Sequence, residues 1–337
     1  MTTNASPRGP LSEALLETLR QPPGRPLPSV ESARHDPLAD DDLQLALYLA
    51  YELHYRGLDG VSDGWEWDPN LLAFRARLEA EFLNALVGLV GPPSSTAPAS
   101  GMDLALRAIA EADVAPSLSR YVEREASIAQ VLEFVVHRSA YQLKEADPHS
   151  WALPRLHGAP KAALVEIQAD EYGDGRPERI HAQLFANTMA ALELDPTYGA
   201  YVDQIPGVTL ATVNLMSFFG LHRRWRGALV GHLALFEMTS SVPNRRYARG
   251  LRRLGLDGSV VEFFDEHVEA DAVHASIATV DLAGGLARQD AALIPDILWG
   301  AQTLVALEHR WAVHLLRAWS DGESSLLAPV PTTGAPA

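Results

Sequence analysis

The sequence predicts an all-α protein. Apolar residues recur at three- and four-residue intervals along most of the chain, which is the spacing of one face of a helix. Capping residues such as Asp and Ser precede several of these segments, and no convincing run alternates between apolar and polar residues as a half-buried strand would. The pattern indicates an N-terminal helical section followed by a bundle of about seven helices.

Composition narrows the classes of function. The chain has 337 residues, of which 47% are hydrophobic, so it can bury a substantial core. Its formal net charge of -16 would be repelled by nucleic acid and by anionic membranes, and we expect neither as a partner. The chain has no cysteine, so a transition metal would have to be held by His, Asp and Glu. We see no secretory signal and no apolar stretch of membrane-spanning length, and we expect a cytoplasmic protein.

The N-terminal third divides into two parts. Residues 1–40 are rich in Pro, Ser and Arg and indicate a flexible leader, or an arm packed on the body, with a short helix over residues 11–20. Residues 41–110 form the N-terminal helical section. One helix follows the cap Asp40-Asp41-Asp42, and another begins at Asp68-Pro69 and runs to about residue 89. The segment 91–101, GPPSSTAPASG, has nothing to bury and is a boundary.

Residues 111–323 are expected to form the main bundle. Its helical stretches, together with the one that precedes it, are predicted at 102–112, 117–146, 161–172, 177–194, 207–220, 227–240, 244–254, 258–284 and 290–319. The last segment, 324–337, is rich in Pro, Ser, Thr and Ala and predicts a disordered tail.

The most specific local motif is His267-Val-Glu-Ala-Asp271-Ala-Val-His274. Its two imidazoles and one carboxylate stand at i, i+4 and i+7, which places them on one face of a helix. Such a stripe offers ligands suited to iron or manganese. The alternative is a solvated acidic face without a metal.

Three further residues extend this set. Glu237 lies in a segment that is apolar nearly all round, so its carboxylate needs a partner, either a metal or an arginine such as Arg245 or Arg246. Glu171 and His181 flank EYGDGRPERIH, where two glycines end one helix and a proline begins the next. This break could turn the two side chains towards one centre, although a surface glutamate and a capping histidine would fit equally well.

The ordered set of six resembles the ligand pattern of the haem-oxygenase-like di-iron oxidases and oxygenases, also described as iron-containing redox enzymes. That pattern is Glu, His ten residues later, a glutamate in the middle of the bundle, and His-x3-Asp-x2-His about thirty residues further on. The residues in those places are Glu171, His181, Glu237, His267, Asp271 and His274. The resemblance covers roughly residues 115–320.

The resemblance implies a haem-oxygenase-like helical bundle in which all six residues are ligands and Glu171 bridges two iron ions. It also implies an enzyme that uses dioxygen to oxidise a small organic molecule, by N-oxygenation of an amine or by oxidative carbon–carbon cleavage or decarboxylation. An external electron donor, a reductase or a ferredoxin-type protein, and a homodimer would be compatible with this activity. The alternative is a helical protein that stores or senses iron without turnover, and it predicts no cavity large enough for an organic substrate.

Other candidate site residues have weaker support in the sequence. Arginines on either side of the Glu237 helix, Arg223, Arg224, Arg226, Arg245 and Arg246, could clamp a substrate carboxylate or simply be solvated. Asp170 or Glu266 could orient an imidazole from behind, and Tyr172 could donate a hydrogen bond within the site. We interpret Glu52 and His54 as structural, because residues two apart face different sides of a helix.

Overall fold

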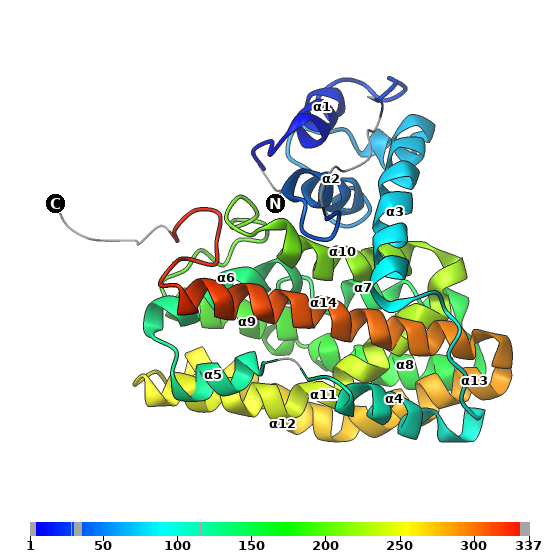
Figure 1. Ribbon diagram of the computed structural model, residues 1–337, viewed down its shortest axis with the longest axis vertical. Helices are drawn as coiled ribbons and strands as arrows, with labels where there is room; N and C mark the ends of the chain where they lie inside the picture. Colours follow the sequence, from blue (N-terminus) through cyan, green and yellow to red (C-terminus); the bar gives the residue numbers. More distant parts are fainter. Residues whose placement is uncertain (1–4, 28, 30–35, 115, 331–337) are drawn as a thin grey trace.

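The computed structural model describes residues 5–27, 29, 36–114 and 116–330, except for the side chains of residues 269–273. Across these ranges the regular structure consists of α-helices, short 3-10 turns and one π-helical stretch, with no strand. The helices form a bundle with an N-terminal section that lies above it in Figure 1. The predicted all-α class is confirmed. No helix of the described residues is long and apolar enough to cross a membrane.

The N-terminal section contains α1 (Pro10–Leu19), α2 (Asp41–Glu52) and α3 (Pro69–Val90). The Asp68 carboxylate accepts hydrogen bonds from the first backbone N–H groups of α3, as expected of a capping residue. Asp42 of α2 does the same for α1, because its carboxylate accepts from the N–H groups of Leu11 and Ser12. Residues 5–20 therefore fit the packed arm, not the flexible leader.

The remaining helices are α4 (Met102–Glu111), α5 (Leu118–Arg124), α6 (Ile128–Gln142), α7 (Asp147–Ser150), α8 (Gly158–Glu171), α9 (His181–Ala191), α10 (Gly207–Leu221), α11 (Arg226–Arg253), α12 (Ser259–Ser276), α13 (Gly284–Gln289) and α14 (Ile294–Ser320). From α5 onwards, seven of those described have eleven or more residues, which agrees with the predicted bundle of about seven. The π-helical stretch, Ile277–Ala283, directly follows α12.

Two predicted boundaries were wrong. The stretch 117–146 is not one helix, because Ser127 and Gln130 form a capping box that starts α6 afresh after α5. The stretches 227–240 and 244–254 are one helix, α11, which continues through Pro243. Packing of α11 against α12 and α14 along its length offsets the hydrogen bond that this proline removes.

The long helices α11 and α14 cross at unusually close range. A Cβ atom on Gly300 would lie 2.0 Å from the carbonyl oxygen of Ala228, and one on Gly231 would lie 1.8 Å from that of Ile297. Only glycine permits such an approach of two backbones. The contact fixes α11, which carries Glu237, against the last helix of the bundle.

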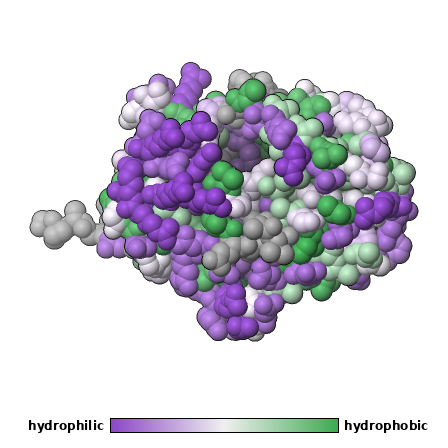
Figure 2. Space-filling view, turned by 90° about the horizontal axis from the view of Figure 1, so that it is seen from below, coloured by the Kyte–Doolittle hydropathy of each residue, from purple (hydrophilic) through white to green (hydrophobic). Residues whose placement is uncertain are grey.

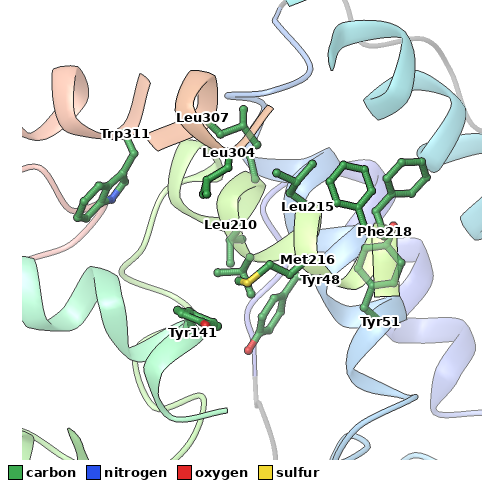
Figure 3. Packing of buried hydrophobic residues seen from close by; sticks show 14 of the residues in the cluster. Tyr48, Tyr51, Tyr141, Leu210, Leu215, Met216, Phe218, Leu304, Leu307 and Trp311 are labelled. Atoms are coloured by element: carbon green, nitrogen blue, oxygen red, sulfur yellow. The ribbon is translucent and has the colours of Figure 1, made fainter. Parts of the chain in front are cut away.

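The N-terminal section joins the bundle through α10. Figure 3 shows Tyr48 and Tyr51 of α2 beside residues of α10, while Leu304 and Leu307 of α14 lie on the other side of α10. All of these side chains are buried and belong to one continuous hydrophobic core. The section is thus an integral part of the core.

The start of the predicted tail is ordered. Ser325 and Leu326 are buried, and the Ser325 hydroxyl donates a hydrogen bond to Glu133 and lies 3.0 Å from Nε2 of His137. The expectation of disorder was therefore wrong for residues 324–330, because composition could not show that a polar pocket on α6 receives this serine. Residues 331–337 lie outside the described residues.

Candidate metal centre

Four helices carry the predicted side chains of the site that the structure describes. Glu171 is the last residue of α8 and His181 the first residue of α9, while Glu237 lies in the middle of α11. His267 and His274 lie on α12, about two turns apart, on the face predicted from their spacing. The five side chains are all buried.

The break between α8 and α9 brings Glu171 and His181 together. Gly173 and Gly175 have φ angles of 66° and 77°, and Asp174 between them has a φ of 51°, so the chain passes through three left-handed residues in succession. Gly173 also lies against the returning backbone, where a Cβ atom would be 2.6 Å from the carbonyl carbon of Arg179. The chain doubles back, and Nδ1 of His181 lies 2.9 Å from Oε2 of Glu171.

The first cluster joins these two residues to His267 and to a residue that the sequence analysis did not single out, Glu145. Each of Glu145, Glu171, His181 and His267 offers one ligand atom, and these atoms all lie within 4.8 Å of one another. Nε2 of His267 is 3.5 Å from Oε2 of Glu145, and the imidazole centroids of His181 and His267 are 4.5 Å apart. Two carboxylates and two imidazoles therefore converge on one point.

The second cluster shares Glu171 with the first. It consists of Glu171, Glu237 and His274, whose ligand atoms also lie within 4.8 Å of one another. Nδ1 of His274 is 3.4 Å from Oε2 of Glu237. Asp271 belongs to the same helix, but its side chain is outside the described part of the structure.

Polar groups behind the imidazoles decide which nitrogen faces the clusters. Nδ1 of His267 lies 2.8 Å from the carbonyl oxygen of Phe263, which can only accept, so Nδ1 carries the proton and Nε2 presents its lone pair to Glu145. Nε2 of His274 lies 3.1 Å from Asp170, which leaves Nδ1 towards Glu237. Asp170 thus takes the orienting position expected of it. Glu266, the alternative to Asp170 in this role, pairs with Arg179 instead.

Glu145 was missed because its position depends on a turn beyond a helix end. It follows α6 and precedes Ala146, which has a φ of 73°, so helical periodicity no longer applies there. The side-chain amide of Gln168 donates a hydrogen bond to the Ala146 carbonyl and ties this turn to α8. No periodic signal in the sequence marks Glu145, because it stands in a short polar stretch, Gln142-Leu-Lys-Glu145, after the end of the helix.

The charges of the two clusters depend strongly on one another. Burial would raise the pKa of Glu171, but His181, His267 and His274 around it lower that pKa to about 2. Burial would lower the pKa of His274, but Glu237, Glu171 and Asp170 raise it to about 9. Without a metal, protons on the imidazoles therefore balance the carboxylates, and a metal ion would take over that role.

The donor atoms fit a metal better than they fit one another. Oε2 of Glu145, Oε2 of Glu171, Nδ1 of His181 and Nδ1 of His274 are buried and have no hydrogen-bond partner in the described structure. Nδ1 of His181 and Oε2 of Glu171 lie within ion-pair distance of each other, and a metal ion between them could accept a lone pair from each. Oxygen and nitrogen donors without sulfur suit iron or manganese.

A cavity of about 510 Å³ adjoins the clusters between α11, α12, α14, α6 and the chain between α4 and α5. Phe236, Ser240 and His267 line both this cavity and the small space between the carboxylates. Figure 2 views the molecule from the side of α11 and α12, and this face is hollowed, with hydrophilic and hydrophobic residues at the rim. The volume is in the range of pockets that enclose small organic molecules.

The arginines and the tyrosine considered above lie in different places. Only Arg246 lines the cavity, while Arg245 is exposed. Arg223 and Arg224 are exposed at the other end of α11, and Arg226 pairs with Asp290. The Tyr172 hydroxyl bonds to Asp147 and Ser150, outside both clusters.

A family model described as iron-containing redox enzyme matches residues 132–309. The chain belongs to this family. The match covers more than half of the chain and contains the described members of both clusters, including Glu145. A comparison with curated proteins finds no match. Membership makes this iron-containing redox enzyme an iron-dependent oxidoreductase, and its all-α structure agrees with the predicted haem-oxygenase-like fold.

Proposed function

We propose that this iron-containing redox enzyme is a non-haem di-iron oxidase or oxygenase that acts on a small organic substrate. The observation that carries the proposal is the position of Glu171, which belongs to both ligand clusters. A carboxylate shared in this way can bridge two metal ions, as carboxylates do in the cores of helical bundles. A single mononuclear site would leave one of the two clusters without a role.

The residues divide between the two ions. Glu145, His181 and His267 would hold one ion, Glu237 and His274 would hold the other, and Glu171 would bridge them. By the family resemblance, Asp271 would be a further ligand of the second ion. Two irons bound there supply the means to activate dioxygen for oxidation of the substrate, either by oxygen transfer or by hydrogen abstraction.

The protein's own side chains prepare the surroundings. The Phe263 carbonyl and the Asp170 carboxylate hold the imidazoles of His267 and His274 from behind, so their other ring nitrogens are oriented towards the clusters. Aromatic residues such as Phe236 and Phe263 make the wall of the cavity beside His267 apolar. The alternative of an iron-storage or iron-sensing protein predicts no such cavity, so the cavity favours turnover.

The test is anaerobic loading with ferrous iron and measurement of iron per chain. We expect about two irons in the wild type, about one in Glu145→Ala, and none in Glu171→Ala, because only Glu171 serves both clusters. Glu166→Ala is the matched control, since Glu166 is an exposed glutamate of the same helix α8. Equal iron content in Glu171→Ala and Glu166→Ala would refute the shared site.

Mixing the loaded protein with oxygen tests the redox part of the proposal. A transient visible absorption band in the wild type that is absent from Glu171→Ala would support oxygen activation at the pair of irons. Stable uptake of two irons without any oxygen-dependent spectral change would instead support storage or sensing.

A further inference from the structure

Two buried histidines that hold no metal in the proposed function lie close to the metal centre. His149 of α7 and His232 of α11 are each 1% exposed, and Nε2 of His149 lies 3.1 Å from Nδ1 of His232. In the described structure this hydrogen bond is the only one that either ring forms, and neither imidazole pairs with a described carboxylate. Each ring therefore keeps one nitrogen for which the described residues provide no partner.

His149 borders the metal centre without belonging to either ligand cluster. It lines the small space between the carboxylates, whose other walls include Glu171, Glu237 and His267. Nε2 of His149 is bonded to His232, so Nδ1 is the nitrogen that can exchange a proton with this space. The space measures about 10 Å³, which is room for about one water molecule.

His232 borders a second small space, also of about 10 Å³, which shares Tyr141 and Phe236 with the first. Arg138 and Glu308 line this second space, and both of them also line the cavity of about 510 Å³. Their side chains are 17% and 28% exposed, so solvent reaches the ion pair that they form. Figure 3 shows part of the wall of the second space, which comes from α6, α10 and α14: Tyr141, Leu215, Met216, Leu304 and Leu307.

Burial keeps both imidazoles neutral. It lowers the pKa of His149 to about 4 and the pKa of His232 well below its usual range. A neutral imidazole has one N–H group and one lone pair, so it can accept a proton at one nitrogen and release another from the second. Two such rings joined by a hydrogen bond can therefore pass a proton from one to the other.

We propose that His232 and His149 form a proton relay between the Arg138–Glu308 ion pair and the space between the carboxylates. With the shared proton on His232, uptake of a proton at its Nε2 moves the shared proton to Nε2 of His149, which then releases the proton on its Nδ1. One proton enters and one leaves, so both rings end neutral.

The use of the relay rests on the proposed function. Reduction of dioxygen to water consumes one proton with each electron, and the ferrous ions or the external donor supply the electrons. A substrate beside His267 would cover the direct path from the cavity to the carboxylates, because His267 lines both spaces. The relay enters at Arg138 and Glu308 and keeps a second path open.

Exchange of imidazole N–H protons with water tests the path in iron-free protein. Saturation transfer in NMR spectra of the chain labelled with ¹⁵N-histidine measures it. His137 is the internal reference, because it is also 1% exposed but both of its nitrogens are occupied, by Thr209 and Ser325. Its proton should exchange only when the structure opens. We expect the proton shared by His149 and His232 to exchange about 10-fold faster or more.

His232→Gln removes the outer ring and keeps a side chain that can bond to His149. We expect exchange of the remaining His149 proton to slow by about 10-fold or more, whereas His157→Gln, at an exposed histidine before α8, should leave it unchanged. An unaltered His137 signal reports that the variant is folded. Exchange of the shared proton no faster than that of His137 would overturn the relay, and this comparison needs no variant. Unchanged exchange at His149 in His232→Gln would also overturn it, because protons would then arrive from the carboxylates.

The decay of the oxygen-dependent absorption band tests the use of the relay, in H₂O and in D₂O. We expect decay in His232→Gln to be slower than in His157→Gln by about 10-fold or more, with a changed solvent isotope effect and equal iron content. Equal decay and an equal isotope effect in the two variants would show that protons take another route. If no band forms in the wild type, the proposed function fails, while the exchange measurements on iron-free protein still decide whether the path exists.

Discussion

Replacing Glu52 by glutamine would leave the ammonium of Lys144 buried without a carboxylate partner. The two side chains are each 1% exposed, and Nζ of Lys144 lies 2.5 Å from Oε1 of Glu52. The hydroxyl of Tyr198 donates to the second oxygen, Oε2, at 2.7 Å. Glu52 belongs to α2 and Lys144 follows α6, so the pair joins the N-terminal section to the bundle.

The expected loss in the free energy of unfolding follows from the burial of both charges. Removal of one partner from a buried ion pair costs about 3–5 kcal/mol, because the remaining charge is still desolvated. We expect this loss in the free energy of unfolding for Glu52→Gln and for Lys144→Met. The double variant removes both charges and should recover most of the loss, to within about 2 kcal/mol of the wild type.

Urea unfolding of the four proteins, followed by circular dichroism, measures these differences. The matched control is Arg249→Met, which breaks the exposed ion pair between Arg249 and Glu123 and should cost less than about 1 kcal/mol. The reasoning is refuted if Glu52→Gln costs no more than this control. It is also refuted if the losses of the two single variants simply add in the double variant.

Gly300→Ala should lower the free energy of unfolding by more than about 3 kcal/mol, because its Cβ would lie 2.0 Å from a carbonyl oxygen of α11. Gly88→Ala, on an open stretch of α3 with nothing within 4 Å, should instead be neutral or stabilise by up to about 1 kcal/mol in the same unfolding assay. The pKa of His274 is raised to about 9, so in metal-free protein its contribution to stability is full below about pH 6.5 and is lost as the pH rises through 9. Unfolding midpoints between pH 6.5 and 9.5 should therefore fall less steeply in His274→Ala than in the wild type. Ser325→Ala should cost about 1–3 kcal/mol, since it leaves buried polar partners on α6 unsatisfied, whereas Ser324→Ala on the exposed neighbour should cost much less; thermal unfolding compares the two.

Local sequence patterns were sufficient to predict which residues of the candidate site share one helix face or need a buried partner. His267 and His274 share a face because helical periodicity is independent of the rest of the fold. Glu237 stood out because a carboxylate in an apolar helix needs a partner, and His274 lies beside it. The glycines after Glu171 indicated a reversal, and the three left-handed residues there produce it.

Contacts between distant segments could not be predicted in this way. Glu145 joins the first cluster through a turn that ends helical periodicity, and its partners lie on three other helices. The pairing of Glu52 with Lys144 spans 92 residues and depends on how α2 docks. The cavity is likewise a property of the packing, because its walls come from segments that are far apart in the chain. The arginine that lines it could not be distinguished from its neighbour by sequence.

The N-terminal section, whose role the sequence left open, is connected to the metal centre through two consecutive residues. Lys144 pairs with Glu52 of that section, while the next residue, Glu145, lies against His267. A buried ammonium beside a ligand carboxylate would compete with a metal ion for it. Because Glu52 already neutralises this ammonium, the carboxylate of Glu145 is left for the first cluster. The section therefore supplies a countercharge as well as hydrophobic packing, and the free energy that holds α2 on the bundle also holds the turn that carries Glu145.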